Sequence, residues 1–250
     1  MIYPKLFLLH LPFSNLPIQI VAMAVDYNKL DNPAWYALNE MHSHFSSGTH
    51  NFKRYNPEIV LFAGFDIDNE DAFKQLDEVV GINESVFLFD KFPSLPANYS
   101  IDAFVECLQM VCPVPLPVEI SEDIVLLNEE NTTEMFSLVS TVFPGYYLLH
   151  TNRMGNYFGI FKENKLVAMA GERLCMNGFT EVSAVVTNPA YTGRRYAQQL
   201  MTHIHKTHVA ENVISFLHTG SNNERAIKIY ELLGYEKRRL IPVNKIKRTA

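Results

Sequence analysis

The stretch YTGRRYAQQ, residues 191–199, combines residue types that together can hold an anion. It follows an apolar run, EVSAVVT at residues 181–187, and leads into an amphipathic pattern. Thr192 is a good helix cap, and Gly193 allows a close approach that a side chain would obstruct. We therefore expect a helix from about Gly193, with the N–H groups of residues 193–197 free at its positive end. Such an end binds anions.

Two adjacent arginines, Arg194 and Arg195, strengthen this interpretation. Cations at a helix N-terminus oppose the helix dipole by roughly 0.3 to 1 kcal/mol each. A pyrophosphate would supply the missing counter-charge. The alternative is that both side chains extend into solvent or pair with acids elsewhere. The stretch alone does not decide between the two, because short glycine motifs often occur without a ligand.

A second pattern, NNERAIKIYELLG at residues 222–234, predicts another amphipathic helix. Asparagine can cap its start, and Gly234 is placed to end it. Tyr230 falls on the inward row, where its hydroxyl must find a partner. By itself such a tyrosine is most often structural.

Together the two stretches resemble the central motifs of the GNAT superfamily of acyl-CoA-dependent N-acetyltransferases. The first family motif reads V-x-P-x-[YH]-[RQ]-G-x-G-x-[AG], and its helix start carries the pyrophosphate of coenzyme A. Here Thr192 replaces the residue before the first glycine, and Arg195 replaces the second glycine. The second motif, N-x-x-A-x-x-[LF]-Y-E-x-x-G-[FY], is matched by Asn223, Ala226, Ile229, Tyr230, Glu231, Gly234 and Tyr235. The resemblance covers about residues 120–248.

The resemblance implies acetyl-CoA as a co-substrate, with no metal. In this sequence the positions that would bind it are Val185, Val186, Thr187, Thr192, Gly193, Arg194, Arg195, Tyr196, Ala197, Asn223, Ala226 and Tyr230. Tyr230 would also be the acid that protonates the leaving thiolate. Glu181 stands where some members carry a catalytic glutamate, and Glu172 on the preceding strand competes with it. A base is unnecessary if the substrate amine arrives neutral.

Three classes of function follow. The first is an N-acyltransferase that moves an acyl group, with acetyl expected, from CoA to a primary amine of a small molecule, amino acid or peptide. The second is a catalytically inactive regulatory module that binds CoA. The third is an interaction protein that uses only the fold. The sequence indicates neither the acceptor nor the oligomeric state.

Composition narrows the partners and the compartment. A net charge of -6 and a pI near 5.8 argue against a nucleic-acid surface. Three cysteines give an odd count without metal-type spacing, which favours free thiols in a reducing compartment. The opening MIYPKLFLLHLPF fits neither a signal peptide nor a membrane span. We therefore expect a cytoplasmic protein without membrane contact. His205 and His208 share a helix face, which we expect to be a polar face rather than a metal site.

These residues must be positioned by an alternation of strands and helices. Prolines at every second position of residues 113–117 predict an extended connection, and we place a domain boundary there. Residues 118–250 predict a GNAT-like α/β (α+β) fold, with a mixed, mostly antiparallel sheet flanked by helices. Residues 1–117 predict a smaller α/β domain. Its stretches NPAWYALNEMHSHF and KRYNPEIVLFAGF resemble the degenerate first half of the two-domain branch related to glycine N-acyltransferases.

Overall fold

The fold is known from a computed structural model, which describes residues 3–5 and 23–250. Most of the apolar opening stretch, for which we expected neither a signal peptide nor a membrane span, lies outside these residues. Within the described ranges no helix combines the length and the apolar character that crossing a membrane requires.

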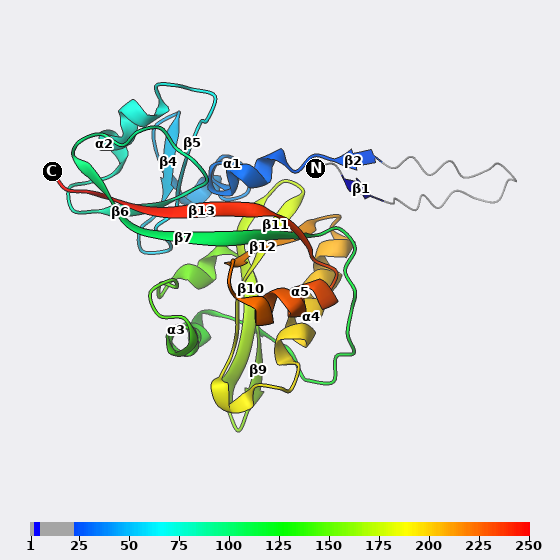
Figure 1. Cartoon of the computed structure of the whole chain (residues 1–250). Helices are drawn as coiled ribbons and strands as arrows, with labels where there is room; N and C mark the ends of the chain where they lie inside the picture. Colours follow the sequence, from blue (N-terminus) through cyan, green and yellow to red (C-terminus); the bar gives the residue numbers. More distant parts are fainter. Residues whose placement is uncertain (1–2, 6–22) are drawn as a thin grey trace, which may run out of the picture.

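One eight-stranded sheet organises the molecule (Figure 1). Its strands, in spatial order, are β6 (Ser85–Phe89), β13 (Glu236–Arg248), β7 (Tyr99–Cys112), β12 (Ile214–Gly220), β11 (Phe179–Thr187), β10 (Lys165–Met176), β9 (Tyr157–Lys162) and β8 (Val125–Leu127). Only the β11–β12 pair is parallel, and every other neighbouring pair is antiparallel. The predicted mixed, mostly antiparallel sheet is therefore confirmed.

Strand β7 was not predicted from the sequence, although it lies near the centre of this sheet. Its C-terminal part, residues 108–112, is buried on both faces and therefore lacks the alternating pattern of a half-exposed strand. Strands from both sides of residue 117 thus share one sheet. The division into domains 1–117 and 118–250 stays a prediction.

Helices cover both faces of the sheet. They are α1 (Pro33–Asn39), α2 (Leu76–Val79), α3 (Thr132–Val142), α4 (Tyr196–Ala210) and α5 (Glu224–Leu232). Helices α4 and α5 pack against one apolar cluster, which includes Leu200, Ile204 and Ile227. Helix α3 packs against a different cluster, with Val186 of β11 and Met169 of β10. The two central strands β10 and β11 are therefore held from both sides.

The N-terminal part adds smaller elements around the end of the sheet formed by β6, β13 and β7 (Figure 1). A hairpin pairs β1 (Tyr3–Lys5) with β2 (Met23–Val25), and a three-stranded sheet contains β3 (Ser46–Gly48), β4 (Phe52–Tyr55) and β5 (Ala63–Phe65). The chain between β5 and β6 forms a 3-10 turn, Ala72–Gln75, followed by the short α2.

Helix α4 confirms one prediction from its sequence pattern and contradicts another. Tyr196, Leu200 and Ile204 are buried, as their helical spacing predicts. The expected polar face at His205 and His208 is wrong, because both side chains are buried. His205 Nε2 lies 3.0 Å from the Tyr235 hydroxyl, so the buried imidazole has a polar partner.

Candidate active site

The central feature is a fork between the two parallel strands. β11 and β12 pair only over residues 179–181 and 214–216. Beyond Phe216, β12 continues along β7 to Gly220 and has no further pairing with β11. In the described part of the chain, the backbone of β11 after residue 181 therefore has no strand partner on the side of the fork. Unpaired strand backbone can bind an extended ligand.

A β-bulge lies inside this fork. In the register, two residues of β11, Ala184 and Val185, stand opposite Ala170 of β10. Ala184 has φ 50°, a left-handed conformation that L-residues other than glycine rarely adopt. A bulge bends its strand and changes the direction of the neighbouring backbone and side-chain groups. We infer that it directs the backbone of Val185, Val186 and Thr187 within the fork.

The junction after β11 differs from the prediction in where its helix begins. A short 3-10 turn, Pro189–Tyr191, is capped by Asn188, whose side chain accepts from the Ala190 N–H. Thr192 is extended, and its hydroxyl donates to the Pro189 carbonyl. Helix α4 begins only at Tyr196, so Thr192 is not its cap. The reason is that a turn intervenes and already uses the Thr192 hydroxyl.

Arg195 occupies the cap position of α4, in a left-handed conformation with φ 60°. Gly193 also has a positive φ, 81°, and a Cβ there would meet no atom within 4 Å. This backbone explains why the family motif has glycine at both positions. Both arginine side chains are exposed, and neither forms an ion pair with any residue that the structure describes. The Arg194 guanidinium lies 5.1 Å from the centroid of the Tyr191 ring.

The second motif forms the start and the inner face of α5. The Asn223 side chain caps the helix by accepting from the Ala226 N–H. Gly234 follows the helix with φ 93°, and a Cβ there would lie 2.3 Å from the Val114 carbonyl oxygen. The predicted roles of these residues at the two ends of α5 are confirmed. A hollow of about 720 Å³ lies against the N-terminal half of this helix, lined by Asn222, Asn223, Glu224, Arg225, Lys228 and Ile229.

Tyr230 is brought to the same apolar cluster as the first motif. Its side chain, with Val185 and Tyr191, packs around buried residues that include Tyr196. Its ring lies 5.8 Å from that of Tyr235. Burial raises the pKa of Tyr230 to about 12, so the hydroxyl carries its proton at neutral pH.

Glu181, the candidate base, is completely buried and ion-paired. Its carboxylate receives two hydrogen bonds from Arg173, at 2.8 and 2.7 Å, and one from His218 at 2.7 Å. Burial by itself would raise the pKa of Glu181, but the charge and hydrogen bonds of Arg173, with the bond from His218, lower it to about 2. A carboxylate with this pKa is a weak proton acceptor at neutral pH. Its assignment as the base stays a prediction.

The hydrogen bonds around His218 fix which nitrogen carries the proton. Gln109 uses its amide oxygen to accept from Arg238, so its amide nitrogen faces Nε2 of His218 at 2.9 Å. An amide nitrogen can only donate, and Nε2 therefore accepts. Nδ1 then holds the proton that it donates to Glu181. His218 is consequently neutral in this arrangement.

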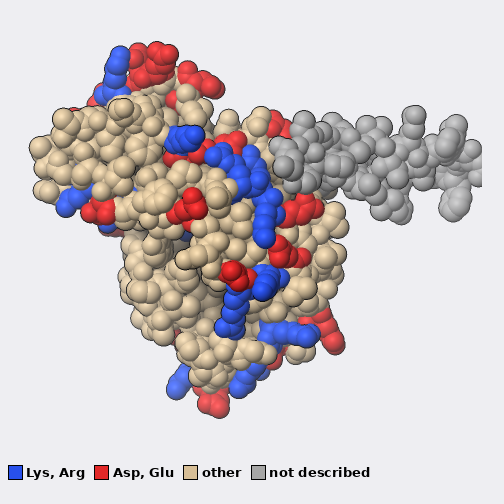
Figure 2. Space-filling view, in the orientation of Figure 1, with Lys and Arg blue, Asp and Glu red and all other residues tan. Residues whose placement is uncertain are grey.

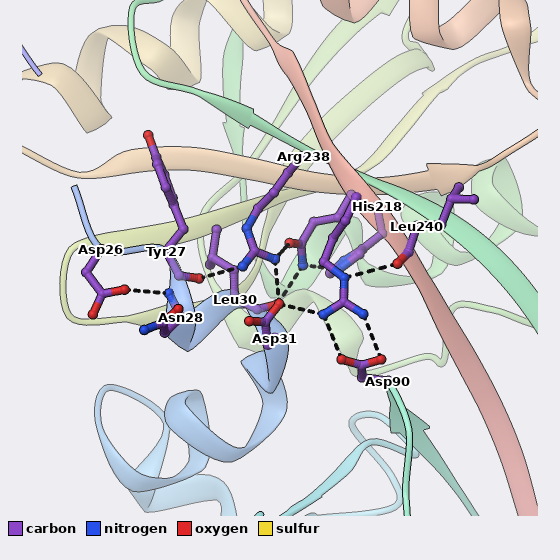
Figure 3. Close-up of polar contacts among 11 residues, drawn as sticks. Asp26, Tyr27, Asn28, Leu30, Asp31, Asp90, His218, Arg238 and Leu240 are labelled. Carbon is purple, nitrogen blue, oxygen red and sulfur yellow. Dashed lines mark hydrogen bonds and ion pairs between the residues drawn. The ribbon is translucent and has the colours of Figure 1, made fainter. Parts of the chain in front are cut away.

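The same contacts continue into the N-terminal part of the chain. Gln109 also donates to the carbonyl of Leu30, and Arg238 contacts Asp31 at 2.7 Å. Figure 3 shows His218 and Arg238 side by side in this chain of contacts, with Asp31 below them. Segments far apart in the sequence thus meet beside the point where β11 and β12 separate.

Glu172, the competing candidate base, also has hydrogen-bond partners. One of its oxygens lies 3.0 Å from His208 Nε2, and the other accepts from the backbone N–H of Asn156. Burial would raise the pKa of Glu172, but the hydrogen bond to His208 and those from Asn156 lower it. Sequence reasoning missed the partners Arg173, His208 and His218. The available signal was the occurrence of charged or imidazole side chains within apolar strands and an apolar helix face.

Comparison with known proteins agrees with this geometry. Residues 124–235 match the family profile described as "Acetyltransferase (GNAT) family". A protein from Novosphingobium aromaticivorans DSM 12444 that is assigned to the GNAT family of acetyltransferases is similar at 28% identity and a TM-score of 0.80, over 89% of this chain and 100% of that one. None of the curated proteins matches the chain.

Two more distant structures share the fold. A GCN5-related N-acetyltransferase from Kribbella flavida has 14% identity and a TM-score of 0.55, over 87% of this chain and 94% of that one. A GNAT-family acetyltransferase from Colwellia psychrerythraea has 15% identity and a TM-score of 0.50, over 78% and 80%. The forked sheet and the similar structures show that this protein has the GNAT fold, and residues 124–235 are similar to the acetyltransferases of that family.

Proposed function

We propose that the protein transfers an acetyl group from acetyl-CoA to a primary amine of a small molecule, amino acid or peptide. The observation that carries the proposal is the fork between β11 and β12, which lies next to a helix start with two arginines that have no acidic partner among the described residues. The unpaired edge of β11 can bind an extended arm that contains amide groups. The helix start that follows it in the sequence can bind a pyrophosphate. A ligand that carries both groups in this order fits the site.

The residues present fit coenzyme A at this place. Gly193 leaves open space in front of its Cα, and N–H groups at the start of α4 stand beside two exposed cations, Arg194 and Arg195. The bulged backbone of Val185–Thr187 would bind the arm along the fork. Acetyl-CoA supplies the activated acyl group when it is bound. The hollow against α5 is lined by two further cations, Arg225 and Lys228.

In the proposed reaction, the amine nitrogen forms a bond to the acetyl carbonyl carbon while the carbon–sulfur bond breaks. The backbone N–H groups of β11 stabilise the charge on the carbonyl oxygen. Tyr230 donates its proton to the departing sulfur, and the proton lost by the amine restores it through solvent. The raised pKa of Tyr230, about 12, keeps this proton in place at neutral pH.

The amine must be deprotonated before it attacks. Glu181 could take this proton only at the cost of its ion pair with Arg173, and Glu172 is hydrogen-bonded to His208 and Asn156. We therefore propose that the acceptor reacts as the neutral amine, with Glu181 as the alternative base. Titration with acetyl-CoA tests binding. The release of the CoA thiol in the presence of a panel of amines then tests the reaction. Failure to bind acetyl-CoA would contradict the proposal.

One observation favours a second candidate, an inactive module that binds CoA. Both glutamates that could serve as bases are engaged in buried contacts. If acetyl-CoA binds and no amine in the panel causes thiol release, the result supports this candidate.

We also propose that the N-terminal part places the protein in the two-domain branch related to glycine N-acyltransferases. The support is that residues 23–112 supply two strands of the main sheet and a small sheet of their own. In this branch a small acyl acceptor such as an amino acid would be expected, and the amine panel therefore includes free glycine.

A further inference from the structure

Arg173 of β10 stands at the point where the fork opens. The register between β10 and β11 shifts between Glu172 and Cys175, which places Arg173 opposite Glu181. Glu181 is the last residue of β11 that pairs with β12. The hydrogen bonds from Arg173 to Glu181 show that both side chains lie on the same face of the sheet. The guanidinium is therefore beside the mouth of the fork.

This guanidinium is held on one edge and keeps free donors on another. Nε and Nη2 of Arg173 donate to the two oxygens of Glu181, at 2.8 and 2.7 Å, and the centroid of the Phe62 ring lies 4.8 Å from Cζ. An arginine carries five N–H donors in a fixed plane, so three remain, and none of them has a hydrogen-bond partner within the described ranges. The side chain is 17% exposed, and Nη1 does not belong to the enclosed polar atoms that lack a partner. Nη1 is therefore open to solvent.

A hydroxyl group lies on the same face of the sheet. Ser183 follows Glu181 by two residues on β11, and the extra residue of the register shift is on β10, so the side chains of Ser183 and Glu181 point to the same side. Ser183 is partly exposed, whereas Glu181 and Val182 are buried. Two residues along a strand span only about 7 Å. One small anion can therefore contact both Arg173 and Ser183.

Charge favours an anion at the free edge of the guanidinium. Tyr157 and Cys107, which also act on Arg173, are neutral at pH 7 because burial raises the pKa of each. The charge of Glu181 is shared between two donors, because His218 also donates to this carboxylate. Glu181 occupies the Nε–Nη2 edge, so a second carboxylate at Nη1 lies closer to the guanidinium than to Glu181.

We propose that the acyl acceptor carries a carboxylate, as a small amino acid does, and that Arg173 Nη1 and the Ser183 hydroxyl bind it. A planar guanidinium that is already held in place matches the geometry of a carboxylate. The carboxylate of the acceptor lies at the mouth of the fork, and its amine extends toward the bulged backbone of Val185–Thr187. The inference rests on the proposed function and narrows its acceptor to amines that bear an anionic group.

Binding of the expected products measures the carboxylate contact without turnover. N-acetylglycine and N-acetylglycinamide differ in the carboxylate, and neither has an amine that titrates. Calorimetric titration in the presence of CoA should show that N-acetylglycine binds roughly tenfold to hundredfold more tightly, as for hydrogen bonds to a charged group. The corresponding pair derived from 4-aminobutyrate covers a longer separation between amine and carboxylate. Equal affinity within both pairs would overturn the proposal.

Two variants locate the contact. Arg173→Lys keeps a cation beside Glu181 but lacks the planar edge, and should reduce the preference for the carboxylate to about twofold or less. Ser183→Ala changes a partly exposed side chain and should weaken N-acetylglycine binding roughly threefold to tenfold, so it tests the site even if Arg173→Lys does not fold. Arg248→Lys is the matched control, because Arg248 is 18% exposed and ion-paired with Asp77. The same preference in all of these proteins would contradict the proposal.

The remaining outcomes separate this inference from the proposed function. Thiol release with amines, without any preference for N-acetylglycine over its amide, would keep the reaction and overturn the carboxylate site. Preferred binding of N-acetylglycine that Arg173→Lys abolishes, without thiol release from glycine or 4-aminobutyrate, would support the carboxylate site and contradict the reaction.

Discussion

At the scale of single residues, Tyr230 joins the two motifs. Its side chain packs with Val185 and Tyr191 around the same buried cluster. We expect Tyr230→Phe to leave acetyl-CoA affinity nearly unchanged and to lower turnover roughly 10- to 1000-fold, since a positioned general acid is lost. Calorimetric titration and thiol release measure the two quantities. Unchanged turnover would make Tyr230 a structural residue.

The pKa of Tyr230 predicts the shape of the pH–rate profile. Burial raises this pKa to about 12, so the phenol stays protonated far above neutral pH. The rate should rise with pH as the substrate amine loses its proton, and should show no falling limb up to about pH 10. Stopped-assay rates between pH 6 and 10 check this. A fall below pH 9 that Tyr230→Phe abolishes would show that the hydroxyl titrates lower.

Sequence reasoning reached some of these residues and not others, for a physical reason. Tyr230 and Gly234 are defined by spacing within one helix, and that spacing is visible in the sequence. Arg173 and His218 depend on strands that meet Glu181 only in the folded sheet. No local pattern records which partner a buried glutamate will find. The sequence therefore predicts Glu181 as a candidate base but does not predict its ion pair with Arg173.

At the scale of elements, the turn between β11 and α4 carries two left-handed residues. Arg195→Gly relieves about 1 to 2 kcal/mol of backbone strain, offset by about 0.4 to 1 kcal/mol of added chain entropy in the unfolded state. We therefore expect the free energy of unfolding to change by about 1 kcal/mol at most, and acetyl-CoA affinity to change little. Denaturant unfolding and acetyl-CoA titration measure both.

Gly193→Val at the same turn should add backbone strain and weaken acetyl-CoA binding, in contrast to Arg195→Gly. Its φ of 81° suits glycine and strains a β-branched residue, although a Cβ would meet no protein atom within 4 Å. The protein should fold, with a cost of about 1 to 2 kcal/mol, and acetyl-CoA binding should be nearly lost. Full affinity in this variant would show that the turn is not the cofactor site.

Three neighbouring strands meet at the Glu181 ion pair. Because Glu181 is buried, Glu181→Gln leaves the Arg173 charge without its partner and should destabilise the fold by about 3 to 5 kcal/mol. The pKa of Glu181 in the folded state is lowered from 4.5 to about 2. The ionised Glu181 carboxylate therefore makes its full contribution to the free energy of unfolding above pH 4.5, and this contribution is lost as the pH falls toward 2. The difference between the two proteins, measured by denaturant unfolding, should shrink from pH 6 to pH 3.

At the scale of the whole molecule, β7 makes the sheet continuous across the connection at residues 113–117. The sequence predicts a mixed, mostly antiparallel sheet with flanking helices after residue 118, because the patterns of those strands and helices are local and regular. It does not predict that a strand from before the connection enters between β12 and β13. Strand order depends on long-range pairing, which neither composition nor periodicity specifies.

This arrangement leads to a test of the predicted boundary. A fragment of residues 118–250 lacks β7, so β12 and β13 each lose the neighbour that joins them. Met110 and Val111, which are completely buried in the full chain, would leave an apolar gap at the centre of the sheet. We expect the fragment to show no cooperative thermal transition and no acetyl-CoA binding, whereas the full chain melts in one transition. Circular dichroism and calorimetric titration of both proteins make the comparison. A fragment that melts cooperatively and binds acetyl-CoA as the full chain does would establish residues 118–250 as an independent domain, with β7 an addition to its sheet.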